Sequence, residues 1–265
     1  MTDGVQRMDF SGKCVIVTGA SSGIGLACAR RFARLGANVV NADLAPHDEH
    51  EKLPEDQRIV WCETDLSDEH AVRALVPFCM SRSGAPDVLV NNAAYVGHKG
   101  GALGETSLEE WKRQLDVTLT GAFLLTSEVL AVMAERREGA IVNVASIGGI
   151  LPFASAAAYS IAKAGLLQMT RSIAVDYGQY GIRCNAVAPG PIDTPTFSSI
   201  KQDSFELRDR ECRTALGRIG RPEEVASAVT FLAGDESSFI TGAVLAVDGG
   251  WSASQWNPQL GPRKI

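Results

Sequence analysis

Three side chains that could together move a proton lie in the middle of the chain: Ser146, Tyr159 and Lys163. Tyr159 and Lys163 are four residues apart, about one helical turn, so on a helix the phenol and the ammonium are neighbours. A free tyrosine has a pKa near ~10 and is a poor base at neutral pH, but a cation fixed beside it favours the phenolate and lowers that pKa. The pair therefore predicts that Tyr159 acts as a general acid or base.

Ser146 follows an apolar strand predicted over Ala140–Val144 and reaches the pair from a separate element. Its hydroxyl could hold the substrate oxygen that exchanges a proton with Tyr159. Taken alone, however, a Tyr-x-x-x-Lys spacing often arises by chance, as a partly buried tyrosine beside a solvated lysine. The strands and helices predicted around these side chains are needed to distinguish a catalytic group from a chance spacing.

A glycine-rich turn follows the apolar run Cys14–Val17 and precedes apolar residues at helical spacing. This order of strand, turn and helix lets the backbone approach a pyrophosphate closely and directs the free N–H groups of the helix at the anion. It predicts a dinucleotide site. The predicted cofactor contacts here are Gly19, Ser21, Ser22, Gly23, Ile24 and Gly25.

The next apolar strand, Asn38–Ala42, ends at Asp43, near the ~20-residue offset expected of an acid that binds the ribose hydroxyls. A carboxylate there would repel a 2′-phosphate, and neither Leu44 nor Ser22 supplies a cation for one. The cofactor is therefore predicted to be NAD. An ordinary acid at the end of a strand is the alternative.

Composition excludes several classes of protein. The 265 residues are 45% hydrophobic and 21% charged, which is typical of a soluble globular domain. A net charge of −6 without a basic cluster predicts no nucleic-acid partner and no membrane partner. The six cysteines and four histidines show no metal-ligand spacing, so no metal is predicted. The N-terminal stretch has no apolar leader, and we expect a cytoplasmic protein.

Alternating strands and helices continue along the chain, and they predict a single α/β domain over 1–265. Its fold class is a doubly wound, Rossmann-type parallel sheet of seven strands with helices on both faces and ligands at the carboxyl ends of the strands. Residues 195–214 show no strong period and are predicted to form an irregular substrate lid. The remaining predicted strands are Ile59–Glu63, Val88–Val90, Arg183–Ala188 and Gly242–Val247, and the predicted helices include Asp68–Ser83, Leu108–Arg136, Tyr159–Tyr177 and Glu223–Ala233.

The turn Thr18-Gly19-x-x-x-Gly23-x-Gly25, followed in order by Ser146, Tyr159 and Lys163, resembles the short-chain dehydrogenase/reductase family over nearly the whole chain. The resemblance implies hydride transfer between a nicotinamide and a secondary alcohol or ketone. Tyr159 would carry the proton, Lys163 would hold the ribose and Ser146 would orient the substrate oxygen.

Further site residues follow from family position. Asp65 and Leu66 would lie against the adenine ring, although a helix N-cap pair is an equal alternative for them. His98 and Phe153 would line the substrate pocket, and His98 could equally be a solvated loop residue. The other implied cofactor contacts are Asn92, Ala93, Pro189, Gly190, Ile192 and Thr194, of which the threonine would meet the nicotinamide carboxamide.

One position departs from the family. The segment Asp116-Val117-Thr118-Leu119-Thr120-Gly121 has a threonine where relatives place an asparagine that connects the lysine to solvent through a water. Thr118 offers one hydroxyl in place of an amide, so it is only a possible member of the catalytic group.

Three functions remain open. The first is an NAD-dependent dehydrogenase for a small alcohol or carbonyl substrate such as a sugar or polyol. The second is a 3-oxoacyl thioester reductase, and the third is a dinucleotide-sensing protein without catalysis. The broad apolar arc of Leu108–Arg136 exceeds what one sheet face would cover, and relatives pair such helices, so a homotetramer is predicted.

Overall fold

A computed structural model describes residues 8–46, 57–95, 102–197 and 202–253 and contains a sheet of seven parallel strands. The strands are β1 (Cys14–Thr18), β2 (Asn38–Asp43), β3 (Ile59–Glu63), β4 (Pro86–Asn91), β5 (Gly139–Val144), β6 (Ile182–Pro189) and β7 (Val244–Val247). Their order is β3-β2-β1-β4-β5-β6-β7, so the winding reverses between β1 and β4. Such a switch point is where open α/β sheets bind ligands. The predicted fold class is confirmed.

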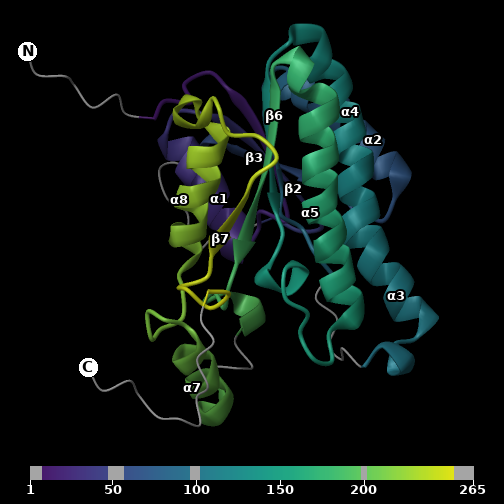
Figure 1. Cartoon of the computed structure of the whole chain (residues 1–265). Helices are drawn as coiled ribbons and strands as arrows, with labels where there is room; N and C mark the ends of the chain where they lie inside the picture. The colour runs from purple at the N-terminus through teal and green to yellow at the C-terminus, as the bar shows by residue number, and fades with distance from the viewer. Residues whose placement is uncertain (1–7, 47–56, 96–101, 198–201, 254–265) are drawn as a thin grey trace, which may run out of the picture.

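Helices cover both faces of the sheet (Figure 1). One face carries α1 (Gly23–Arg34) and α8 (Pro222–Ala233), and the other carries α2 (Glu69–Arg82), α4 (Gly121–Arg136) and α5 (Ala157–Tyr177). Alternate residues of a strand point to opposite faces. Val15 and Val17 therefore pack with Phe32 of α1, whereas Ile16 packs with Leu125 of α4. Burial on both faces explains why β1 is apolar throughout.

The long helix predicted over Leu108–Arg136 is present but not uniform. It begins as α3 (Leu108–Leu115), capped by the Ser107 hydroxyl, which accepts the N–H of Glu110 at 3.1 Å. A π-helical turn over Asp116–Thr120 then leads into α4. The predicted helix over Leu108–Arg136 is therefore interrupted at Thr118 rather than regular throughout. Turns of this kind are frequent at functional sites.

By length and composition, Leu108–Arg136 could cross a membrane, since an 18-residue window has a mean hydropathy of 1.7. Core helices of soluble proteins pass the same test. Here Leu125, Val129 and Met133 are fully buried in the cluster that covers one face of the sheet. The apolar composition of α4 is therefore explained by its contact with the sheet.

The stretch predicted to be irregular contains a helix, α7 (Ser204–Arg213), so that prediction is wrong for these residues. Asp203 caps the helix by accepting the N–H groups of Phe205 and Glu206 at 2.9 and 3.1 Å. Two ion pairs between residues four apart stabilise it further, and none of its residues is buried. A helix held by its cap and charges shows no apolar period, which is why pattern analysis missed it.

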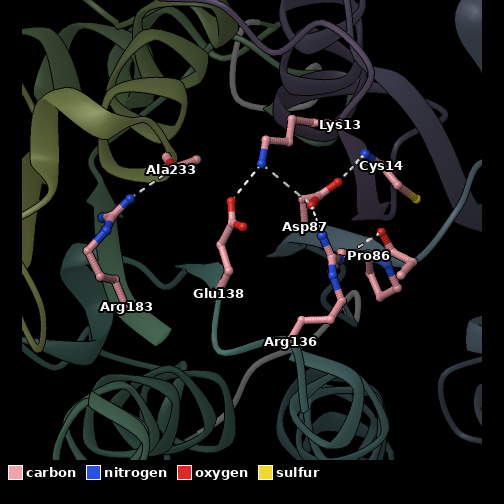
Figure 2. Close-up of polar contacts among 9 residues, drawn as sticks. Lys13, Cys14, Pro86, Asp87, Arg136, Glu138, Arg183 and Ala233 are labelled. Carbon is pink, nitrogen blue, oxygen red and sulfur yellow. Dashed lines mark hydrogen bonds and ion pairs between the residues drawn. The ribbon is translucent and has the colours of Figure 1, made fainter. Parts of the chain in front are cut away.

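Charged side chains connect the amino-terminal ends of the central strands, at the other end of the strands from their carboxyl ends (Figure 2). Lys13 binds Glu138 at 2.7 Å and Asp87 at 3.7 Å. Asp87 also accepts hydrogen bonds from Arg136 at 2.7 Å and from the N–H of Cys14 at 2.8 Å. The network ties the starts of β1, β4 and β5 together.

Arg183, at the start of β6, caps the end of α8. Its guanidinium donates to the carbonyls of Leu232 at 2.7 Å, Ala233 at 2.9 Å and Gly234 at 3.0 Å, and to Ser237 Oγ at 2.8 Å. Figure 2 shows the bond to Ala233. The last carbonyls of a helix have no partner within the helix, so a cation there satisfies them and the helix dipole together. Burial lowers the pKa of Arg183.

Candidate active site

A cavity of about 750 Å³ opens at the carboxyl ends of the strands, at the switch between β1 and β4. It brings together most of the side chains singled out from the sequence, although they come from distant segments. The predicted site residues that line it are Gly19, Ser22, Gly23, Ile24, Asp43, Asp65, Leu66, Asn92, Ala93, Ser146, Phe153, Tyr159, Lys163, Pro189, Gly190, Ile192 and Thr194. Ser21, Gly25 and Thr118 lie outside the lining, and His98 lies outside the described residues.

The glycine turn is packed so tightly that only backbone fits at two positions. A Cβ on Gly25 would lie 2.0 Å from the carbonyl oxygen of Gly19, and a Cβ on Gly19 would lie 2.9 Å from Ala93 Cα. Gly19 also has a φ of +64°, which favours glycine. Gly25 thus lets α1 pack closely against the turn.

The amino end of α1 is free to bind an anion. Ser22 occupies the N-cap position but makes no side-chain cap hydrogen bond, and the first turn has no acidic residue. Free N–H groups and the positive end of the helix dipole suit a phosphate. Because Ser22, Gly23 and Ile24 line the cavity, this chain offers a fitting seat for the pyrophosphate of a dinucleotide.

Asp43 is held at the cavity wall by backbone donors. Its carboxylate accepts the N–H of Ser21 at 2.9 Å and the N–H of Leu44 at 2.7 Å. The Ser21 hydroxyl donates to the carbonyl of Ala45. Ser21 therefore braces the glycine turn against the end of β2, and its hydroxyl is already used within the protein.

Asp65 is not the cap of α2, so the N-cap alternative is wrong. The cap is Asp68, which accepts the N–H of His70 at 2.9 Å. Asp65 instead accepts the hydroxyl of Ser67 at 2.7 Å and its N–H at 2.8 Å, and these bonds lower the pKa of Asp65. Asp65 is thereby fixed as a carboxylate at the cavity.

Thr18, the first residue of the glycine-rich motif, joins β1 to the segment after β4. Its Oγ1 accepts the N–H groups of Asn92 and Ala93, both at 3.0 Å. The Asn92 amide in turn donates to the carbonyls of Thr18 at 2.9 Å and Gly19 at 3.0 Å. These bonds connect the carboxyl ends of β1 and β4 beneath the cavity.

Ser146, Tyr159 and Lys163 converge as their spacing predicted. Ser146 lies just after β5, where its Oγ accepts the N–H of Gly148 at 3.0 Å and is hydrogen-bonded with Tyr159. Tyr159 and Lys163 share one face of α5, with the Lys163 Nζ 5.9 Å from the centre of the phenol ring. The ammonium donates to the carbonyl of Val144 at 2.8 Å.

The pKa predicted for Tyr159 is wrong in direction. Burial raises the pKa of Tyr159, and the hydrogen bond with Ser146 only partly opposes it. Burial also lowers the pKa of Lys163, to about 7. Both groups lose water, so each is shifted toward its neutral form, and the ammonium is bonded to a carbonyl rather than to the phenol oxygen.

Thr118 is fully buried in the π-helical turn and does not reach the cavity. Its Oγ1 accepts the N–H of Tyr95 at 3.1 Å and the side-chain amide of Gln114 at 3.0 Å. A hydroxyl has two acceptor sites and one donor, so only the O–H remains available. Thr118 holds Tyr95, whose side chain belongs to the cavity lining.

The cavity residues that were not identified from the sequence include Arg113, Arg210 and Trp251. Arg113 lies 5.0 Å from the centre of the Tyr95 ring, and Arg210 lies 5.7 Å from that of Phe197. No motif marks them. The position of Arg210 within the predicted lid was the one available signal. Within the described residues, no group of three His, Cys, Asp or Glu side chains could hold a metal.

Comparison with known proteins identifies the family of this chain. A family model described as enoyl-(acyl carrier protein) reductase matches residues 19–252. The cis-4-hydroxycyclohexanecarboxylate dehydrogenase of Sinomonas cyclohexanicum is 44% identical over 247 residues, which are 92% of this chain and 98% of that protein. The chain belongs to the short-chain dehydrogenase/reductase family.

Other members agree in sequence and fold. The meso-2,3-butanediol dehydrogenase of Serratia marcescens is 38% identical over 96% of this chain and all of its own length. The crystal structure of levodione reductase superposes with a TM-score of 0.86 at 33% identity, covering 92% of this chain and 99% of that one. As a member of this family, the protein is an oxidoreductase that acts on CH–OH groups with a nicotinamide cofactor, NAD or NADP.

Proposed function

We propose that the protein is an NAD-dependent dehydrogenase that interconverts a small secondary alcohol and its ketone without a metal. The observation that supports this most directly is that Ser146, Tyr159 and Lys163 face the same cavity as the uncapped end of α1 and Asp43. The first group suits proton transfer, and the second suits a dinucleotide.

A bound nicotinamide would donate or accept the hydride. Ser146 would hold the substrate oxygen, and Tyr159 would give that oxygen a proton during reduction or take one during oxidation. Because burial favours the neutral phenol, Tyr159 is ready to donate at neutral pH, and alcohol oxidation should be favoured by alkaline pH. Lys163 would bind the ribose and donate toward the phenolate when it forms.

The preference for NAD rests on Asp43. Its carboxylate lies at the cavity wall and would accept hydrogen bonds from the ribose diol, while repelling a 2′-phosphate. Asp43→Ala should raise activity with NADP relative to NAD, mainly through KM. Equal catalytic efficiency of the wild type with both cofactors would contradict this assignment.

The substrate is proposed to be a small or cyclic hydroxylated molecule, such as a polyol, a sugar or a ring alcohol. Two relatives are named for a hydroxycyclohexanecarboxylate and for a butanediol, which agrees with a compact substrate. Reduction of a 3-oxoacyl thioester is the second candidate, favoured by the acyl-carrier description of the matching family model.

A substrate panel separates the two candidates. The purified protein would be mixed with NAD and secondary alcohols, and with NADPH and an acetoacetyl thioester, while cofactor absorbance is followed. We expect turnover with NAD and at least one small alcohol. Activity confined to the thioester would favour the second candidate, and cofactor binding without turnover of any substrate would contradict both.

Assembly and location are part of the proposal. Phe123 on α4 and Ile161 and Val175 on α5 expose 54%, 42% and 81% of their surface, although all three are apolar. Exposed apolar side chains on neighbouring helices suit contact with further copies of the chain, so a homotetramer is proposed. With its acidic composition, the protein is proposed to work in the cytoplasm.

A further inference from the structure

Arg210 of α7 brings a guanidinium to the cavity. Its Nε is buried and has no hydrogen-bond partner among the residues that the structure describes. Glu206, one turn earlier, lies 3.7 Å from Nη2, which is ion-pair distance but too long for a hydrogen bond. A buried donor without an acceptor is unfavourable, and because 34% of the Arg210 side chain is exposed, its terminal N–H groups can meet a ligand in the cavity.

The other charged side chains of the described cavity lining do not neutralise the positive charge of Arg210. The charged residues among the described part of its lining are Asp43, Asp65, Arg113, Lys163 and Arg210. Asp43, at the end of β2, accepts the N–H groups of Ser21 and Leu44, and the positive charge of Arg113 acts on Asp65 after β3. Lys163 is bound by the carbonyl of Val144.

The surroundings of Arg210 are aromatic. Its guanidinium lies 5.7 Å from the centre of the Phe197 ring, and Phe197 and Trp251 both belong to the lining. A planar cation stacked near a ring is held in orientation and is less hydrated than an ammonium. This end of the cavity therefore offers apolar contact for a carbon skeleton beside a donor for an anion.

We infer that Arg210 binds a carboxylate on the substrate and so selects acidic secondary alcohols over neutral ones. The inference rests on the proposed dehydrogenase function and specifies its substrate class. A guanidinium matches a carboxylate because two parallel N–H groups can meet its two oxygens. The pyrophosphate of the cofactor is the competing anion, but the uncapped amino end of α1 already offers it a seat.

The test measures binding of small carboxylates that cannot be oxidised. Propionate, benzoate and cyclohexanecarboxylate, each beside its carboxamide, would be titrated by calorimetry into the protein saturated with NADH. We expect at least one carboxylate to bind more tightly than its amide. Arg210→Met keeps the length of the side chain but removes its charge, and should weaken that carboxylate by ~10–100-fold while changing its amide little.

Arg208→Met is the matched control, because it removes the same charge from an exposed position of the same helix. It should leave the carboxylate preference intact. The inference fails if no carboxylate binds more tightly than its amide, or if Arg208→Met removes the preference as Arg210→Met does. It also fails if Arg210→Met weakens NADH instead, which would assign the anion to the cofactor.

The proposed function is tested separately by wild-type turnover of neutral alcohols with NAD. Turnover that persists without any carboxylate preference would leave the dehydrogenase assignment standing and remove only the role of Arg210.

Discussion

Tyr159 and Lys163 are four residues apart on one helix, where Lys163 is buried and Tyr159 is half-buried at the cavity. For the phenol, burial disfavours the charged form and raises its pKa, and for the amine, burial disfavours the charged form and lowers its pKa to about 7. The two pKa values, nearly equal in free side chains, are thus moved apart, and the proton stays on the phenol. A neutral phenol at the cavity can act as the acid that donates a proton to a substrate oxygen.

At this scale the first prediction concerns Tyr159. Tyr159→Phe keeps the ring but removes the hydroxyl that would exchange a proton, so turnover should fall by about 10²–10⁴-fold. NADH affinity, measured by fluorescence titration, should be retained. Tyr177→Phe, near the far end of α5, is the control and should keep normal turnover. Near-native turnover of Tyr159→Phe would mean that another group carries the proton.

The second prediction concerns Lys163 and pH. Folding lowers its pKa from 10.5 to about 7, so between these values the unfolded chain binds more protons and stability rises with pH. Below that window Lys163 is charged in both states and its burial is at its most costly. The free energy of unfolding of the wild type, minus that of Lys163→Met, should therefore increase through the window, by at most about 1.4 kcal/mol per pH unit.

Urea unfolding of both proteins at about pH 6.5 and about pH 9.5 measures this difference, and contributions from other groups cancel in the subtraction. A difference that does not change with pH would show that Lys163 keeps an ordinary pKa in the folded protein.

Helix ends differ in whether a side chain closes them. The amino end of α1 is left uncapped and faces the cavity, whereas α2, α3 and α7 are closed by Asp68, Ser107 and Asp203. The end of α8 is closed by Arg183 from β6. The amino end of α1 can therefore bind a ligand, whereas these other ends are satisfied within the protein.

The third prediction follows from the Arg183 cap. Arg183→Met would leave the carbonyls of Leu232, Ala233 and Gly234 without their donor, and should lower the free energy of unfolding by about 2–4 kcal/mol. Arg171→Met, at an exposed position of α5, should change it by less than about 0.5 kcal/mol. Comparable urea midpoints for the two variants would show that the cap contributes little.

In the whole molecule, the two ends of the parallel strands differ in their side chains. The amino-terminal ends are connected by ion pairs among Lys13, Asp87, Arg136 and Glu138. The carboxyl ends of the strands border the cavity, where backbone and a few polar groups can bind ligands. Substitutions at the amino-terminal ends should therefore change the free energy of unfolding, and substitutions at the carboxyl ends should change ligand binding and turnover.

The fourth prediction concerns assembly. Light scattering at micromolar concentration should give the mass of a tetramer, or at least of a dimer, because Phe123, Ile161 and Val175 expose apolar surface on α4 and α5. Phe123→Asp should shift the mass toward smaller species while the far-ultraviolet circular dichroism stays unchanged. A wild-type mass equal to the 28.2 kDa of one chain would contradict the prediction.

The sequence pattern predicted the parallel sheet, the glycine turn and the group Ser146, Tyr159 and Lys163, all of which the structure contains. Apolar runs buried on both faces, such as Cys14–Val17, report a parallel sheet, and the glycine turn reports a close backbone approach, because both constraints act on neighbouring residues. Only the tertiary structure decided the pKa directions at Tyr159 and Lys163, the π-helical turn at Thr118 and the approach of Arg210 to the cavity. Burial and contact between distant segments depend on packing, and local spacing carries no record of them.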